Sequence, residues 1–181
     1  NTIGIHSGAD DNASGTAGLL EIAQKLVSQK SRLKRSVLLL GFDAEEKGLL
    51  GAKYFVENPL VDLQNIVTMI NLDMIGRMKD SSITVGGVGT SQLFEPLLNG
   101  ESIGRNFTIN MTKPGYGPSD HAAFYTKDIP VLFFFTGFHN EYHTPEDSRK
   151  LINLKGEKDI LDLVYDVTFK LSRLPERPVF T

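Results

Sequence analysis

Cysteine is absent from this chain of 181 residues, and its absence removes two classes of structure. The protein has no disulfide bonds and no thiolate ligands, so a structural zinc site of the usual cysteine type is excluded. The absence fits a reducing and an oxidising compartment equally well. Any metal bound by this chain must be held by carboxylates and histidines.

Long hydrophobic runs and basic patches are also scarce. No stretch approaches 18 apolar residues, so the sequence predicts no membrane-spanning helix. The net charge is -3, and the one basic cluster, Lys30, Arg32, Lys34 and Arg35, has no interleaved aromatic residues. We therefore expect no nucleic-acid partner. A composition of 40% hydrophobic and 23% charged residues is typical of an ordinary globular domain, and we expect a single domain over 1–181.

Hydrophobic periodicity predicts alternating helices and strands. The expected helices span 14–29, 49–57, 91–104 and 153–174, and the expected strands span 36–42, 66–72, 82–88, 108–111 and 131–136. Residues 113–121 contain too much glycine and proline for anything but a loop. The alternation predicts an α/β fold, a three-layer α/β/α arrangement with a mainly parallel sheet.

Four polar islands lie between these elements, each with a side chain that can bind a metal. They read "GADDNASG" (8–15), "DAEEKGLLGA" (43–52), "NLDMIGR" (71–77) and "EYHTPEDS" (141–148), and they contain Asp11, Glu46, Asp73 and His143, with Glu45 as a spare carboxylate. Oxygen and nitrogen ligands without thiols are typical of a catalytic zinc site. Because open α/β sheets bind ligands beyond the carboxyl ends of their strands, we expect these residues to meet at one edge.

Each island taken alone also has a simpler interpretation. An Asp-Asp-Asn run before a helix is usually a solvated cap, the Glu45–Glu46 pair suits a surface loop, and His143 suits an ordinary loop histidine. Asp73 is harder to dismiss, because it ends an apolar strand and a buried charge needs a partner. The placement of all four islands at the same edge favours the metal site.

Together with "SDHAAF" (119–124), the islands resemble the motif series of the dizinc aminopeptidases of the bacterial leucyl aminopeptidase type, from residue 8 to about residue 150. The resemblance implies a zinc-exopeptidase-like fold and a zinc-dependent aminopeptidase that hydrolyses the N-terminal bond of a peptide substrate. It implies that Asp11 bridges two zinc ions, that Glu46 and His143 complete the first, and that Asp73 joins the second. It also implies a cis peptide bond between Asp11 and Asn12.

The same resemblance implies roles in the reaction. Glu45 becomes the general base, with metal-bound hydroxide as the nucleophile. Tyr142 matches a position where some relatives stabilise the developing oxyanion, although a packing aromatic with its hydroxyl in water explains it equally well. Ser119 and Asp120 are expected to support the ligands, and Ser119 would orient His143.

Candidates for an apolar substrate pocket are Met74, Ile75 and Tyr116, since they lie near the expected site. Core packing is the competing interpretation for such residues. A preference for apolar N-terminal residues is the corresponding expectation.

One part of the family's pattern is missing. Relatives carry a His-x-Asp motif upstream of the bridging Asp, whereas only His6 precedes Asp11 here, outside any such motif. We therefore expect the N-terminal strands of the fold to lie upstream of Asn1, as would any signal peptide for the expected secreted or periplasmic location. The position formed by Asp11, Glu46 and His143 should bind zinc more firmly than the second position.

Three other functions remain open on this scaffold. A carboxypeptidase needs a basic clamp for the substrate carboxylate, and Arg77 and Lys113 are the candidates. A glutaminyl cyclase needs a single zinc ion. A catalytically inactive interaction domain would need neither a basic clamp nor a zinc ion. The presence of Glu45, Glu46, Asp73 and His143 argues against such a domain.

Overall fold

One four-stranded sheet lies at the centre of the computed structural model, which describes residues 4–181. Its strands are β1 (Met69–Leu72), β2 (Ser82–Gly86), β3 (Thr108–Met111) and β4 (Val131–Phe135), in the order β1-β4-β2-β3. β1 runs parallel to β4 and β2 runs parallel to β3, while β2 and β4 are antiparallel. Two of the three pairings are therefore parallel, as expected, but the sheet as a whole is mixed, because β1 and β4 run opposite to β2 and β3.

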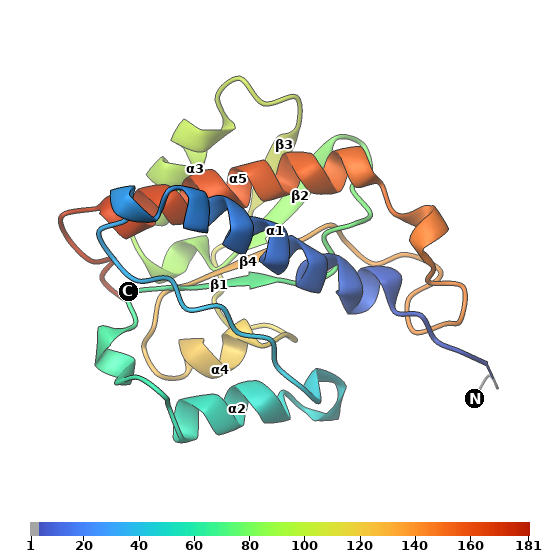
Figure 1. The fold of residues 1–181 in the computed structure, drawn as a ribbon, viewed down its shortest axis with the longest axis horizontal. Helices are drawn as coiled ribbons and strands as arrows, with labels where there is room; N and C mark the ends of the chain where they lie inside the picture. The colour runs from blue at the N-terminus through green and yellow to red at the C-terminus, as the bar shows by residue number, and fades with distance from the viewer. Residues whose placement is uncertain (1–3) are drawn as a thin grey trace.

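Helices cover both faces of this sheet (Figure 1). α1 (Gly15–Ser28), α3 (Phe94–Ser102) and α5 (Leu154–Arg173) pack on one face, and α2 (Leu50–Glu57) and α4 (His121–Tyr125) pack together on the other. The three-layer α/β/α arrangement is therefore confirmed. Among residues 4–181, no helix has the length and apolar character needed to cross a membrane.

Two hydrophobic clusters, one on each face, hold the sheet in place. The larger lies under α1, α3 and α5 and includes Phe94, Phe134 and Leu163, while the smaller lies under α2 and α4 and includes Phe124 and Val131. Burial of each large apolar side chain contributes about 1.5–3 kcal/mol. Because β4 contributes to both clusters, it is fixed on both faces, and the loops beyond its carboxyl end start from a rigid base.

The prediction of a strand over 36–42 is wrong. This segment makes no ladder hydrogen bonds, and its Leu38 and Leu39 are 49% and 41% exposed. β1 is the edge strand on this side, and a cavity of about 1080 Å³ is lined by both β1 and the segment. Within the described residues, the segment therefore has no strand near enough to pair with, although its composition is typical of a strand.

The other elements agree with the sequence to within a few residues, with one addition. The four expected helices are present, and β1 begins at Met69 rather than at residue 66. Residues 113–120 form the expected loop, but α4 starts at His121, where no helix is predicted. A helix of five residues is too short to show a helical period in the sequence.

Candidate metal centre

The four polar islands meet beyond the carboxyl ends of β1 and β4. Asp73 directly follows β1, and its N–H donates to the carbonyl of Phe134 in β4 at 3.2 Å, which continues the ladder by one residue. The chain after β4 leads into the loop of His143, Asp11 lies just before α1, and Glu46 lies on a short turn before α2. The expected meeting at one edge is what the structure shows.

Asn12 fastens the Asp11 loop to the end of β1. Its Nδ2 donates to the carbonyl of Leu72 at 2.9 Å, and its Oδ1 accepts from the N–H groups of Gly15 and Met74 at 3.0 and 3.2 Å. A Cβ at Gly15 would lie 2.4 Å from the Leu72 carbonyl, so only glycine lets α1 begin this close to the sheet. The Asp11–Asn12 peptide bond is cis, as the resemblance implies.

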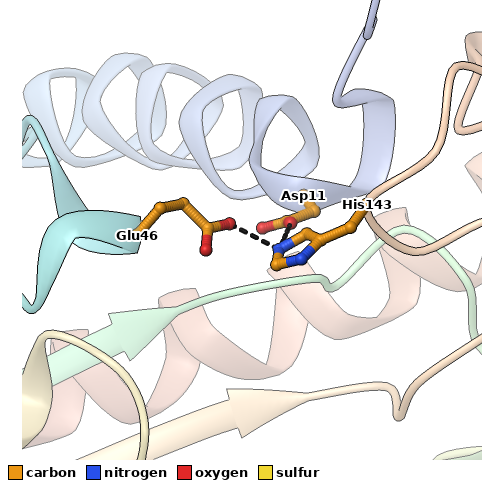
Figure 2. Close-up of side chains that lie close together, drawn as sticks. All are labelled: Asp11, Glu46 and His143. Carbon is orange, nitrogen blue, oxygen red and sulfur yellow. Dashed lines mark hydrogen bonds and ion pairs between the residues drawn. The ribbon is translucent and has the colours of Figure 1, made fainter. Parts of the chain in front are cut away.

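Asp11, Glu46 and His143 form a compact group (Figure 2). His143 Nε2 lies 2.7 Å from Glu46 Oε1 and 3.2 Å from Asp11 Oδ2, and one ligand atom from each residue falls within 4.8 Å of the others. One imidazole nitrogen and two carboxylate oxygens are the number and kind of protein ligands that a catalytic zinc ion takes. The donor set of these residues therefore fits zinc.

Several carboxylates crowd around this group. Burial, together with the charges of Asp73 and Glu46, raises the pKa of Asp11 to about 6. Burial, Asp73 and Glu46 likewise raise the pKa of Glu45 to about 7. Burial also raises the pKa of Asp120 to about 6, with Asp73 adding to the effect. Crowded acids of this kind repel one another when ionised, and a bound cation would offset the repulsion.

Asp73 lies outside the group of three, but its charge is close enough to raise the pKa of Asp11. Burial is the main cause that raises its pKa, and the hydrogen bond from Ser119 acts in the opposite direction. Ser119 Oγ donates to Asp73 Oδ2 at 2.7 Å, while Oδ1 of Asp73 is buried without a hydrogen-bond partner among residues 4–181. An unpaired buried carboxylate oxygen is unusual and fits a metal ligand.

Ser119 contacts Asp73 and not His143, the residue that the resemblance implies. Its hydroxyl accepts a hydrogen bond from Asn71 Nδ2 at 2.7 Å and donates one to Asp73 Oδ2 at 2.7 Å, so it orients Asp73 rather than His143. The reason is position, because Ser119 lies two residues before α4, and α4 packs against β1, which Asp73 directly follows. Asp120 lines the same cavity as Asp11, Glu45 and Asp73.

Tyr142 lies beside the group of three. Its ring stacks on His143 with a centroid distance of 3.7 Å. Burial, with Asp11 and Glu46 as further causes, raises the pKa of Tyr142 to about 12, so its hydroxyl keeps its proton at neutral pH. An exposed ring that the sequence does not single out, Phe138, lies edge-on to Tyr142 with centroids 5.0 Å apart.

The three residues expected to line a substrate pocket do not form one. Ile75 has no exposed surface and packs in the larger core cluster, so it has no surface to offer a substrate. Met74 is 3% exposed and Tyr116 is 71% exposed, and neither contributes to the cavity beside the site. The run "DMIG" places Met74 and Ile75 where the chain turns away from β1 into the core.

Two buried acids near the site carry no motif-based assignment. Asp10 precedes Asp11, and Asp147 follows His143 by four residues; both are nearly inaccessible to solvent. A signal was available in the sequence, because each lies within four residues of a predicted metal ligand in the same island. What they contact depends on tertiary structure, which the sequence alone does not give.

Comparison with known proteins identifies the family. Residues 2–168 match the sequence profile of Peptidase family M28. The chain belongs to this family. Aminopeptidase YwaD of Bacillus subtilis is 29% identical over 188 residues, which cover 94% of this chain and 39% of that protein. Leupeptin-inactivating enzyme 1 of Streptomyces exfoliatus is 31% identical over 132 residues, which cover 72% of this chain and 30% of that protein.

Solved structures of aminopeptidases share the fold of this M28 chain. The LapA aminopeptidase of Legionella pneumophila superposes with a TM-score of 0.80 at 27% identity, over 97% of this chain and 50% of that one. The zinc aminopeptidase BSAP of Bacillus subtilis superposes with a TM-score of 0.75 at 26% identity, over 99% of this chain and 47% of that one. The α/β zinc-exopeptidase-like fold is thereby confirmed. The chain spans about half or less of the length of each of these relatives.

Proposed function

We propose that this M28 chain forms the metal-binding part of a zinc-dependent aminopeptidase, which hydrolyses the first peptide bond of a substrate with a free N-terminus. The observation that carries the proposal is the group of Asp11, Glu46 and His143, with Glu45 on the same turn as Glu46. The aminopeptidase names of the relatives support the reaction type.

Asp11, Glu46 and His143 would hold the first zinc ion. Zinc at this position would lower the pKa of water and polarise the carbonyl of the scissile bond. Asp73 would belong to a second and weaker position, shared with Asp11. Its placement outside the group of three and its unpaired Oδ1 support that division.

Glu45 would move the proton. With a pKa of about 7 it is poised to accept a proton near neutral pH. In the proposed reaction, Glu45 takes a proton from water, the water oxygen bonds to the carbonyl carbon, the C–N bond breaks, and Glu45 returns the proton to the leaving amine. Tyr142, protonated because its pKa is about 12, would donate a hydrogen bond to the negative charge that develops on the carbonyl oxygen.

Burial of Arg77 weakens the carboxypeptidase alternative. Its Nη2 pairs with Glu141 Oε2 at 2.8 Å, and its side chain is 10% exposed, so it is not free to clamp the carboxylate of a substrate. Lys113 stays as the other clamp candidate. A glutaminyl cyclase is the second candidate function, because one group of three ligands suits a single zinc ion. The intact ligand group disfavours an inactive interaction domain.

A substrate panel separates these functions. The protein is stripped with a chelator, divided, and assayed with and without added zinc on peptides with a free N-terminus, the same peptides N-acetylated, and peptides that begin with glutamine. We expect zinc-dependent release of the first amino acid from free N-termini and none from acetylated peptides. Cleavage from the C-terminus, cyclisation of N-terminal glutamine without release, or no reaction by protein that has bound zinc would contradict the proposal.

A further inference from the structure

Asp147 makes contacts that join two metal-ligand loops. It lies four residues after His143 and is 2% exposed. Its Oδ2 accepts from the backbone N–H of Asp10 at 2.9 Å and from that of Asp11 at 3.1 Å, and its Oδ1 lies 3.2 Å from the N–H of Asp10. Its own carbonyl accepts from the N–H of Ala9 at 3.2 Å. Three consecutive amides of the Asp11 loop therefore bond to one residue of the His143 loop.

These contacts depend on one another. A buried carboxylate is unfavourable unless hydrogen-bond donors replace the lost water. Among residues 4–181, Asp147 forms no ion pair, so the N–H groups of Asp10 and Asp11 are the donors that offset its burial. Conversely, its carboxylate fixes the peptide plane on the N-terminal side of Asp11, and that plane sets the direction in which the Asp11 side chain leaves the backbone.

Asp10, which precedes Asp11, anchors the Asp11 loop from the opposite side. Asp10 Oδ1 accepts from the N–H of Gly76 at 2.7 Å and from Ser14 Oγ at 3.0 Å, which ties the loop to the chain that follows β1. The Asp10 side chain and Asp147 thus hold the backbone on two sides. The Asp11 carboxylate lies beyond them, with its Oδ2 3.2 Å from His143 Nε2.

We propose that Asp147 is a positioning residue for the metal centre, which holds Asp11 at the distance from His143 at which both bind the same ion. Asp147 itself binds no metal in this arrangement; it acts through the backbone of Asp11. The proposal rests on the zinc site of the proposed function but not on the proposed reaction. Because the Asp10 anchor stays in place when Asp147 is changed, the effect should fall on metal affinity more than on folding.

The test compares Asp147→Asn and Asp147→Ala with Glu146→Gln, a neighbouring exposed acid whose change removes the same charge. Zinc affinity is measured by competition with a chromophoric chelator, and hydrogen–deuterium exchange of the segment 8–15 is measured without metal. Loss of a partner that orients a metal ligand weakens affinity by roughly 10- to 100-fold. We expect a loss of this size for Asp147→Ala, a smaller one for Asp147→Asn, which keeps one acceptor oxygen, and faster exchange in both. Glu146→Gln should match the wild type.

A double-mutant cycle distinguishes positioning from general support of the fold. If Asp147 acts through Asp11, the effect of Asp147→Asn on zinc affinity should largely disappear in an Asp11→Asn background. Unchanged zinc affinity in Asp147→Asn, an equal loss in both backgrounds, or failure of both Asp147 variants to fold would overturn the proposal. Wild-type protein that binds zinc but releases no amino acid would refute the proposed function and leave this inference standing.

Discussion

His143 Nε2 lies 2.7 Å from Glu46 Oε1, although the two residues are 97 positions apart in the chain. Their side chains are 48% and 53% exposed, and exposed ion pairs contribute little to stability. The pair therefore does not hold its loops together. The backbone hydrogen bonds that Asp147 accepts from Asp10 and Asp11 hold the His143 loop against the Asp11 loop instead, so the proposed site does not depend on the contact between His143 and Glu46, which a shared ion would replace.

Zinc bound by Asp11, Glu46 and His143 should stabilise the folded protein. At a free zinc concentration 100 times the dissociation constant, binding adds about 2.7 kcal/mol to the free energy of unfolding. We expect His143→Ala to remove most of the increase in Tm on zinc addition, measured by differential scanning calorimetry. His6→Ala, which changes an exposed histidine, should keep the increase. A full zinc-induced shift in His143→Ala would exclude His143 as a ligand.

Glu45→Gln should separate metal binding from catalysis. The change removes the proposed proton acceptor but keeps the size of the side chain, so we expect kcat to fall roughly 10²- to 10⁴-fold. Zinc affinity, set by the group of Asp11, Glu46 and His143, should stay within about twofold of the wild type. Glu57→Gln, on the exposed end of α2, is the matched control. A kcat for Glu45→Gln near that of Glu57→Gln would rule out the assigned role.

The metal-free protein should lose stability as the pH rises from about 4 to about 7. The pKa of Asp11 rises from 3.8 to about 6 and that of Glu45 from 4.5 to about 7, so the folded state binds more protons than the unfolded state in this window. The free energy of unfolding therefore decreases as the pH rises. The stabilisation from these two raised pKa values is complete below the unfolded-state values and is lost as the pH passes through the folded-state values. Melting curves in the presence of a chelator measure this slope.

Glu45→Gln also tests whether Glu45 contributes to the pH dependence of stability in the metal-free protein. The variant cannot ionise at position 45, so its Tm should fall less between pH 4 and pH 7 than that of the wild type. Saturating zinc near pH 7 should restore the Tm of the wild type. Parallel melting profiles for the two metal-free proteins would show that Glu45 does not contribute to the pH dependence.

Motifs and periodicity, which are local properties, predicted most of the fold and the residues of the candidate site. The helix over 153–174 shows its apolar face in the sequence, and Asp11, Glu46, Asp73 and His143 each lie in a short island. Contacts set by tertiary structure could not be predicted in this way. The lack of a partner strand for 36–42 among the described residues depends on where the sheet ends. The roles of Glu45 and Tyr142, the single domain and the strands expected upstream of Asn1 stay predictions.

The burial of Ile75 is another tertiary contact that the sequence did not predict. Its sequence neighbours suggest a substrate pocket, whereas the side chain is fully buried in the core. Ile75→Val should therefore lower the free energy of unfolding by roughly 0.5–1.5 kcal/mol, measured by urea titration, and leave KM unchanged. Tyr116→Phe, on an exposed side chain, should change neither quantity. A higher KM for Ile75→Val with unchanged stability would place Ile75 against the substrate.

Ser119→Ala tests which ligand the Ser119 hydroxyl supports. The change removes the hydrogen bond to Asp73 Oδ2, and Asp73 Oδ1 has no partner among the described residues, so the pKa of Asp73 should rise further and protons should compete better with metal. We expect calorimetric titration at pH 7 to show weaker binding of a second zinc equivalent and unchanged binding of the first. Ser102→Ala, on a half-buried serine at the end of α3, serves as the control. Because His143 belongs to the proposed first position, a weaker first equivalent in Ser119→Ala would mean that Ser119 acts on His143 after all.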